Sequence, residues 1–231
     1  MLIGKPELQL INDYQAVIRD EHSLINASVA LILRDTHNGT EVLMMQRAKH
    51  ERDPWSGQMS FPGGKIETTD DSYKAAAIRE AHEEVGAELN DDNCIGRLDD
   101  LLGLKVNDTF SAHVRCYVFK PTGDIKLKAN HEVADMVWLP LAFLNDANNA
   151  YAFNHPIDPS LSMPSVMIND AKEQILWGMS LRMLMNLYGL LDWPLAVLSD
   201  EDKANLDSME SRRLNKENAD RITQSIGNRT P

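Results

Sequence analysis

Three glutamates and two glycines form the group of residues in this chain whose types and spacing best suit a reaction. Glu80, Glu83 and Glu84 stand within five residues of one another, downstream of the adjacent Gly63 and Gly64. Carboxylate oxygens on a rigid element are ligands that Mg²⁺ and Mn²⁺ prefer, and these ions fill their remaining coordination sites with water and phosphate oxygens. Glycine lacks a Cβ, which lets the backbone approach a ligand or turn a carbonyl oxygen toward an ion. The group therefore indicates a divalent-metal site that handles phosphates.

The glutamates are expected to lie on a helix from residue 72 to residue 85. Asp71 or Ser72 can cap its N-terminus, and Gly86 stands where a glycine commonly ends a helix. At about 100° per residue the glutamates share one arc, whereas His82 falls on the opposite, apolar side and is expected to pack there. A solvated acidic face is the alternative interpretation of such a helix. The glycine pair upstream favours the metal site.

The composition of the chain limits the classes of protein to which it can belong. The chain has 231 residues, a net charge of -12 and no apolar run of the roughly 18 residues that a membrane-spanning helix needs. Its first residues do not read as a signal peptide, and Cys94 and Cys116 have no metal-ligand spacing, which fits a reducing compartment. We expect a cytoplasmic protein without a membrane or nucleic-acid partner, because phosphates attract basic rather than acidic surfaces. An anionic substrate then requires bound cations to offset the charge.

The order of the expected elements predicts an α+β fold with a central mixed sheet, because strands and helices do not alternate strictly. Strands are expected at residues 27–35, 41–48, 101–106, 111–119, 133–140 and 165–168, and helices at 6–20, 72–85 and about 173–191. One domain is expected over residues 1–198. The charged residues 199–231 are expected to form a helical or disordered tail.

The last of these helices begins near Trp177 and is rich in methionine and leucine. It is expected to pack in the core or to form the face of a homodimer rather than to line a ligand pocket.

The stretch that begins at Gly64 resembles the signature of the Nudix hydrolases. That signature is a glycine, five residues, a glutamate, seven residues and then Arg-Glu, an aliphatic residue, any residue, Glu-Glu, any residue, Gly and an aliphatic residue. Gly64 opens it here and REAHEEVGA (79–87) closes it. The spacing is one residue longer than the general pattern, so its acidic position falls on Asp70 or Asp71. The resemblance implies an α/β/α sandwich around a mixed sheet that hydrolyses nucleoside diphosphates linked to another moiety, with Mg²⁺ or Mn²⁺.

A longer resemblance is to the coenzyme A diphosphatase branch of this family, which shows the same extended spacing with Asp. The stretch LMMQRAKHERDPWSGQMSFPGG (43–64) matches the upstream pattern of that branch at Leu43, Arg47, Ala48, Arg52, Gly57 and 61–64. It departs at Met45, where the branch has threonine, and by one extra residue between Arg52 and Gly57. The resemblance implies cleavage of coenzyme A or acyl-CoA to 3′,5′-ADP and (acyl-)4′-phosphopantetheine.

Two alternatives stay open beside coenzyme A. The first is a Nudix hydrolase that acts on ADP-ribose, dinucleoside polyphosphates or nucleoside triphosphates. The second is a Nudix-like binding module without hydrolysis, which would be expected to have lost one of the ligand glutamates.

The resemblance assigns the metal to Glu80, Glu83 and Glu84, with the Gly63 carbonyl as a backbone ligand. Arg79 would pair with Asp70 or Asp71, or orient one of the glutamates.

The family draws its general base from different places. One of the helix glutamates serves, or a loop acid such as Glu132, which precedes an expected strand. Arg47 and Arg52 are expected to bind the phosphates of the substrate, since guanidinium groups match phosphate oxygens well, and Gly64 is expected beside the substrate.

Overall fold

The computed structural model describes residues 1–20, 22–51, 55–106, 109–155, 162–207 and 224. Arg52 lies outside these residues, as does the tail from residue 208 onward except residue 224. In the described part of the chain, no helix is long and apolar enough to cross a membrane. The expected cytoplasmic location stays a prediction.

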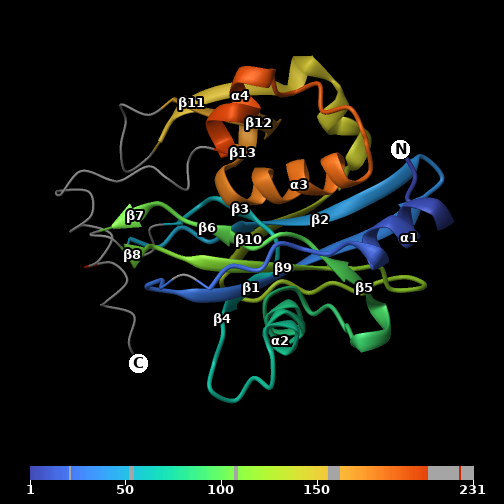
Figure 1. Cartoon of the computed structure of the whole chain (residues 1–231), viewed down its shortest axis with the longest axis vertical. Coiled ribbons are helices and arrows are strands. Elements are labelled where there is room, and N and C mark those ends of the chain that lie inside the picture. Colours follow the sequence, from blue (N-terminus) through green and yellow to red (C-terminus); the bar gives the residue numbers. More distant parts are fainter. Residues whose placement is uncertain (21, 52–54, 107–108, 156–161, 208–223, 225–231) are drawn as a thin grey trace.

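An eight-stranded mixed sheet forms the middle of the molecule (Figure 1). Its main path runs in the order β10 (Val133–Pro140), β2 (Gly39–Arg47), β1 (Asn26–Thr36), β9 (His113–Phe119) and β5 (Cys94–Arg97). Three short strands pair with this path, namely β3 (Met59–Ser60) with β2, β4 (Gly63–Lys65) with β1 and β6 (Leu101–Leu102) with β9. The pairing of β1 with β9 is parallel and the other pairings are antiparallel. The predicted mixed sheet is confirmed.

Helices cover both faces of this sheet. Helix α2 (Tyr73–Val85) lies on one face and α3 (Gly178–Leu190) on the other (Figure 1). Side chains alternate along β1, so that Ala30 and Ile32 join the apolar cluster beneath α2 and their neighbour Leu31 joins the cluster beneath α3. Because both faces are buried, β1 reads as a continuous apolar run rather than as an alternation. The α/β/α arrangement follows from this two-sided burial.

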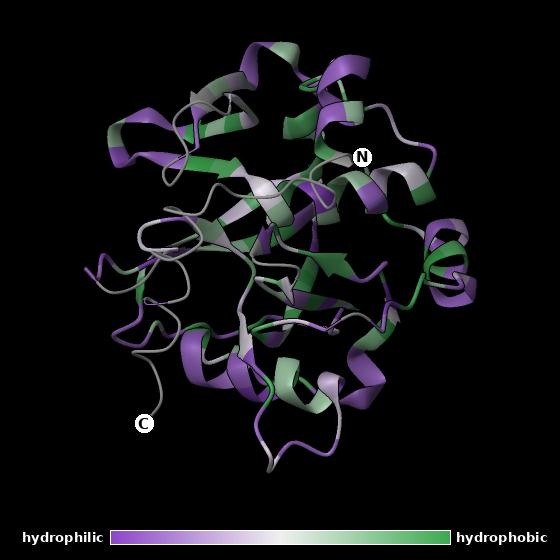
Figure 2. Cartoon of the chain, turned by 60° about the vertical axis from the view of Figure 1, so that its left-hand side comes forward, coloured by the Kyte–Doolittle hydropathy of each residue, from purple (hydrophilic) through white to green (hydrophobic). Residues whose placement is uncertain are grey.

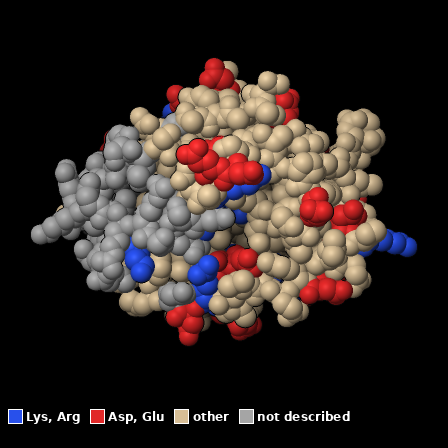
Figure 3. All heavy atoms as spheres, turned by 45° about the horizontal axis from the view of Figure 1, so that its top comes forward, with Lys and Arg blue, Asp and Glu red and all other residues tan. Residues whose placement is uncertain are grey.

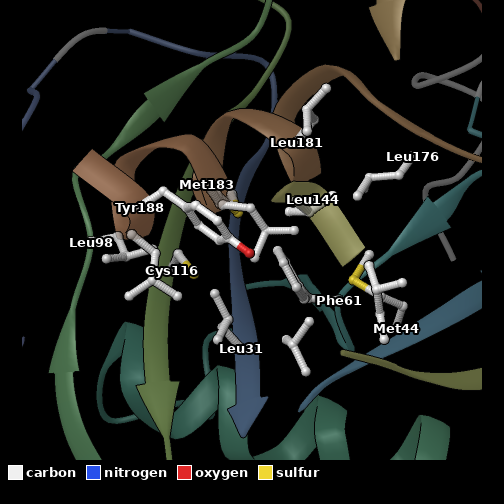
Figure 4. Close-up of a cluster of buried hydrophobic side chains, with 14 of the residues drawn as sticks. Leu31, Met44, Phe61, Leu98, Cys116, Leu144, Leu176, Leu181, Met183 and Tyr188 are labelled. Atoms are coloured by element: carbon white, nitrogen blue, oxygen red, sulfur yellow. The ribbon is translucent and has the colours of Figure 1, made fainter. Parts of the chain in front are cut away.

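Figure 4 shows the cluster beneath α3, where Tyr188 and Met183 of the helix face Leu31 and Phe61 of the sheet layer. Figure 2 shows that hydrophobic residues lie along the central strands and that hydrophilic residues lie in the outer loops and helical turns.

The remaining elements surround these layers. A second, antiparallel sheet has the order β11 (Ala150–Asn154), β12 (Ser162–Asn169) and β13 (Gln174–Trp177), and it lies on the α3 side near α4 (Asp200–Asp207) (Figure 1). Helix α1 (Lys5–Asp13) packs against β5, and β7 (Lys105–Val106) pairs with β8 (Thr109–Phe110). The 3₁₀ turns are η1 (Asp91–Asn93), η2 (Leu141–Asn145), η3 (Ala147–Asn149) and η4 (Asp170–Lys172).

Several predicted elements are confirmed. The hairpin expected at 27–35 and 41–48 is β1 and β2, and the strand expected at 133–140 is β10. Ser72 caps α2 by accepting a hydrogen bond from the Ala75 N–H at 3.1 Å. Gly86 ends the helix in the left-handed conformation, with φ of 67°, as a C-terminal glycine commonly does.

Two predicted helices are wrong in part. The helix expected from about 173 begins only at Gly178, because the preceding residues pair with β12 as strand β13. The helix expected over 6–20 ends at Asp13, since the chain beyond it is held on another element: the Asp99 carboxylate accepts hydrogen bonds from Tyr14 Oη and the Val17 N–H.

The strand expected over 101–106 is interrupted. Its first residues pair with β9 as β6, whereas its last pair with β8 as β7. The division into a domain of 1–198 and a tail stays a prediction.

Leu31→Ala tests the two-sided burial of β1. The fully buried side chain lies in the centre of the cluster beneath α3, so its truncation is expected to lower the free energy of unfolding by about 2 to 5 kcal/mol. Urea denaturation measures the change. Leu10→Ala, at an exposed position of α1, is the matched control and should stay within about 0.5 kcal/mol of the parent. Equal effects of the two substitutions would contradict the packing described here.

Candidate functional site

A cleft of about 830 Å³ is lined by residues of several elements, including α2 from one face of the sheet and α3 from the other. Its walls come from the start of β1, the loop after β2, strands β3 and β4, helix α2, the loop before β10, and the junction of β13 with α3. A volume of this size suits a ligand of cofactor dimensions. Charged residues line one wall: Arg47, Lys49, Lys65, Glu80, Glu84 and Glu132.

Glu84 is the most deeply placed of these charged side chains, at 2% exposure. Its Oε2 accepts a hydrogen bond from the Gly63 N–H at 2.8 Å, and its Oε1 lies 3.8 Å from Nη1 of Arg47. Burial raises the pKa of Glu84 to about 8, and the carboxylates of Glu80 and Glu132 add to the rise, while Gly63 and Arg47 oppose it. A buried carboxylate among other carboxylates is costly unless a cation accompanies it.

The glycine pair allows this arrangement through close packing. A Cβ on Gly63 would lie 2.4 Å from the Ser28 carbonyl oxygen and 2.6 Å from Cα of Val29, so that β4 could not pair with β1 as it does. A Cβ on Gly64 would lie 2.4 Å from Oε1 of Glu80. The space beside Gly64 is therefore occupied by the Glu80 carboxylate.

Arg79 joins the loop before α2 to the glutamates of the helix. Its Nε and Nη2 donate to the two carboxylate oxygens of Asp70 at 3.0 Å each, and its Nη1 donates to Glu80 at 3.0 Å and to Glu83 at 3.1 Å. Asp70, and not its exposed neighbour Asp71, thus fills the acidic position. The hydrogen bonds from Arg79 hold the pKa of Asp70 below its usual value, and burial raises the pKa of Glu80.

Only two of the three helix glutamates line the cleft. Glu80 and Glu84, one helical turn apart, line the cleft, whereas Glu83 is 53% exposed beside Arg79 and is not part of the lining. Among the residues described, no three His, Cys, Asp or Glu side chains are arranged to hold a metal ion. The expectation that His82 packs is wrong: it is 60% exposed, and its Nε2 lies 3.1 Å from Oε1 of Glu88.

Backbone hydrogen bonds bring Glu132 to the same wall. Its carbonyl oxygen accepts the Ala48 N–H at 2.7 Å, and its N–H donates to the Asn130 side chain at 2.8 Å. The Asn130 N–H donates in turn to the Glu84 carbonyl oxygen at 2.9 Å. The loop that carries Glu132 is therefore tied to the end of β2, next to Arg47, and to the last turn of α2. The predicted site residue Arg52 lies outside the described part of the chain.

Another part of the cleft wall is apolar, and some of its residues bear on a prediction. The helix expected from about 173 was predicted to pack in the core or to form a dimer face rather than to line a ligand pocket. Core packing is confirmed for Leu181, Leu184 and Leu187, but Trp177, Met179 and Met183 also line the cleft. The reason is the strand β13, which delays the start of α3 and places its first turns at the cleft. The wall is completed by Ile25, Ala27, Val29, Met59, Phe61, Ala112 and Val114. A homodimer face on this helix stays a prediction.

Sequence reasoning also missed two residues of the charged wall. Lys65 directly follows the glycine pair, and His131 directly precedes Glu132. Their positions beside predicted site residues were the available signal.

Figure 3 shows one face of the molecule, on which acidic side chains are scattered and basic side chains lie close to some of them. Pairing of this kind offsets local charge in a chain whose net charge is -12.

The model of the NUDIX domain matches residues 24–160, which include β1, the glycine pair, α2 and Glu132. The chain belongs to the Nudix domain family. This match covers more than half of the 231 residues. The family membership agrees with the α+β fold and mixed sheet described above.

Curated and solved proteins show similarity of different extent. The "Probable nudix hydrolase C6G9.05" of Schizosaccharomyces pombe is 30% identical over 164 residues, which are 70% of this chain and 54% of that protein. The "Uncharacterized Nudix hydrolase NudL" of an Enterobacter species is 54% identical over 44 residues, 19% of this chain and 22% of that protein. The chain thus spans about half the length of the Schizosaccharomyces pombe relative and a smaller part of the Enterobacter relative.

A crystal structure of a MutT/nudix family protein from Enterococcus faecalis aligns with 97% of this chain and 88% of its own, at 12% identity and a TM-score of 0.49.

Alanine at each of the two glycines is expected to have a different effect on stability. Gly63→Ala places a methyl group against the backbone of β1, and should lower the free energy of unfolding by about 2 kcal/mol or more. Gly64→Ala meets only the end of the flexible Glu80 side chain, and should cost less than about 1 kcal/mol. Denaturant unfolding of both variants measures the difference. A Gly64→Ala variant as unstable as Gly63→Ala would contradict the described packing.

The pairing of Asp70 with Arg79 predicts a pH-dependent contribution to stability. Asp70→Asn should lower the free energy of unfolding by about 1 to 3 kcal/mol at pH 7, since it weakens charge-assisted hydrogen bonds. Because the pKa of Asp70 is lowered in the folded protein, the stabilisation is present above the unfolded pKa of about 3.9 and is lost as the pH falls through the folded pKa.

Thermal unfolding of the parent and of Asp70→Asn between pH 3 and pH 8 tests this dependence. The gap between the two should narrow toward the acidic end. Asp71→Asn, at the exposed neighbour, is the control and should follow the parent throughout. A gap between parent and Asp70→Asn that persists unchanged at the lowest pH would show that the Asp70 charge does not contribute.

Proposed function

We propose that this protein is a metal-dependent hydrolase that cleaves the diphosphate bond of a nucleoside diphosphate derivative. The observation that carries the proposal is the buried carboxylate of Glu84, held by the Gly63 N–H beside Arg47 in a cleft that also contains Glu80 and Glu132. Membership of the Nudix family supports the reaction class.

The chemistry of the donors fits Mg²⁺ or Mn²⁺. Glu80 and Glu84 present carboxylate oxygens one helical turn apart, and the burial of Glu84 leaves its charge without solvent to stabilise it. We assign the ligands to these two residues, to Glu83 and to the Gly63 carbonyl oxygen. A bound divalent ion would offset phosphate charge and acidify the attacking water.

The other charged residues take supporting roles in this proposal. Arg47 binds the phosphate oxygens, since its guanidinium lies at the cleft beside Glu84. Arg79 positions Glu80 and Glu83 through the hydrogen bonds that it donates to them. Glu132 is proposed as the general base that accepts the proton of the attacking water, because its loop is fixed at the cleft wall by the Ala48 N–H. Arg52 is proposed as a second phosphate ligand from the sequence alone, and Gly64 leaves room beside the substrate.

For the substrate we propose coenzyme A or acyl-CoA, cleaved to 3′,5′-ADP and (acyl-)4′-phosphopantetheine. Two observations support it: the upstream match that includes Arg47, and the apolar residues of the cleft, which include Trp177 and Met183. A diphosphate with an extended, weakly polar arm would contact both the charged and the apolar residues. ADP-ribose, dinucleoside polyphosphates and nucleoside triphosphates are the competing substrates, and a non-catalytic binding module is the competing class.

Product analysis of the purified protein with Mg²⁺ or Mn²⁺ separates these substrates. Coenzyme A, an acyl-CoA, ADP-ribose and a dinucleoside polyphosphate are offered in parallel. We expect the protein to release 3′,5′-ADP from the coenzyme A substrates. We also expect kcat/KM to be highest for these substrates. A higher kcat/KM for ADP-ribose would overturn the substrate, and no hydrolysis of any of them would favour the binding module.

Glu84→Gln tests the metal assignment. The amide removes the buried charge but keeps the shape of the side chain. We expect kcat/KM to fall about a hundredfold or more at saturating metal, because loss of a metal ligand should lower activity at least as much as loss of a residue that orients a ligand. Glu88→Gln removes an equal charge from an exposed position just beyond α2 and serves as the control with parental activity. Full activity of Glu84→Gln would overturn the assignment.

A further inference from the structure

We propose that Arg47 is the resident counter-ion of the metal site: it neutralises Glu84 when no divalent cation is bound and turns to the substrate phosphates when one is. The inference rests on the proposed function and concerns the order in which ligands bind. Metal binding would release the guanidinium, and the released guanidinium would then help to bind the anionic substrate.

The two oxygens of Glu84 face different partners. Oε2 is occupied by a neutral donor, the Gly63 N–H at 2.8 Å, whereas Oε1 faces the positive charge of Arg47 at 3.8 Å. That distance is an ion-pair contact and exceeds the range of a good hydrogen bond, so Oε1 retains room for another ligand. Glu84 is nearly fully buried and Arg47 is 19% exposed, and both residues line the cleft.

The backbone of Arg47 is fixed while its side chain reaches the cleft. Arg47 is the last residue of β2, where it pairs with Val133 of β10, and its N–H donates to the Gln58 carbonyl oxygen at 3.0 Å. A change of side-chain rotamer could therefore move the guanidinium between Glu84 and a phosphate in the cleft without any change in the sheet.

Electrostatic repulsion disfavours contact of the Arg47 guanidinium and a divalent ion with Glu84 at the same time. A guanidinium and a divalent ion that both contact Glu84 would repel each other strongly at the low dielectric of a buried site. Arg79 is not the counter-ion of Glu84, because its hydrogen bonds go to Asp70, Glu80, Glu83 and the Lys65 carbonyl oxygen. Lys49 is not that counter-ion either, since it pairs with Glu173 at 2.9 Å and is 76% exposed.

Calorimetric titration of metal-free protein with MnCl₂, without substrate, tests the inference. Arg47→Met matches the unbranched arginine side chain as far as Nε and removes the charged group beyond it, so Mn²⁺ should bind roughly tenfold more tightly than to the parent. Arg47→Lys keeps the charge and should stay close to the parent. Lys49→Met removes a charge from the same wall but not from Glu84, and is also expected to match the parent.

A second titration measures the coupling between metal and anion. With 3′,5′-ADP as the probe, Mn²⁺ should strengthen nucleotide binding to the parent more than to Arg47→Met, because only the parent gains a released guanidinium. If Arg47 only stabilised the fold, Arg47→Met would not both tighten Mn²⁺ binding and weaken the coupling between Mn²⁺ and 3′,5′-ADP. Circular dichroism melting confirms that each variant is folded, and Arg47→Gln replaces Arg47→Met if the latter does not fold.

Unchanged or weaker Mn²⁺ binding in Arg47→Met, together with weaker binding in Glu84→Gln, would overturn the counter-ion role and leave the metal site standing. Parental Mn²⁺ binding in Glu84→Gln would instead overturn the metal assignment in the proposed function, and the counter-ion role with it.

Discussion

The hydrogen bond from the Gly63 N–H to the Glu84 carboxylate is the contact on which the site depends. It joins β4 to α2 and places a charged group where the helix packs on the sheet. The contact requires that the strand carry no side chain at Gly63 and that the helix lie close, which the buried Ala77 and Ala81 permit. Larger residues at these helix positions would separate α2 from the sheet and move Glu84 away from its donor.

The same closeness organises the charges around the cleft. Glu84 is buried by the packing of α2, so that its carboxylate needs nearby positive charge, and Arg47 supplies it from the end of β2. Glu80, one turn earlier, occupies the space that Gly64 leaves and is held by Arg79. The fold therefore fixes an acidic group in a poorly solvated position, where the cost of burial favours the binding of a cation.

Much of this arrangement follows from local sequence, and the remainder depends on contacts between distant segments. The helix with Glu80 was predictable because Ser72 and Gly86 mark its two ends. The depth of Glu84 was not, since a helical wheel groups it with exposed Glu83 and contains no information about the Gly63 N–H. Strand β13 was predicted as helix for the same reason, because a short apolar run becomes a strand only where a partner such as β12 is available.

The residues that line the cleft do not all come from one part of the chain. The charged wall lies within residues 24–160, which match the family model, whereas Trp177, Met179 and Met183 of the apolar wall lie beyond them. Under the proposed function, part of the surface that recognises the substrate's arm is thus encoded outside the segment that carries bond cleavage. Substitutions around the start of α3 could alter which arm is accepted while the glutamates and their hydrogen bonds remain unchanged, so new specificities are accessible to this scaffold without loss of its chemistry.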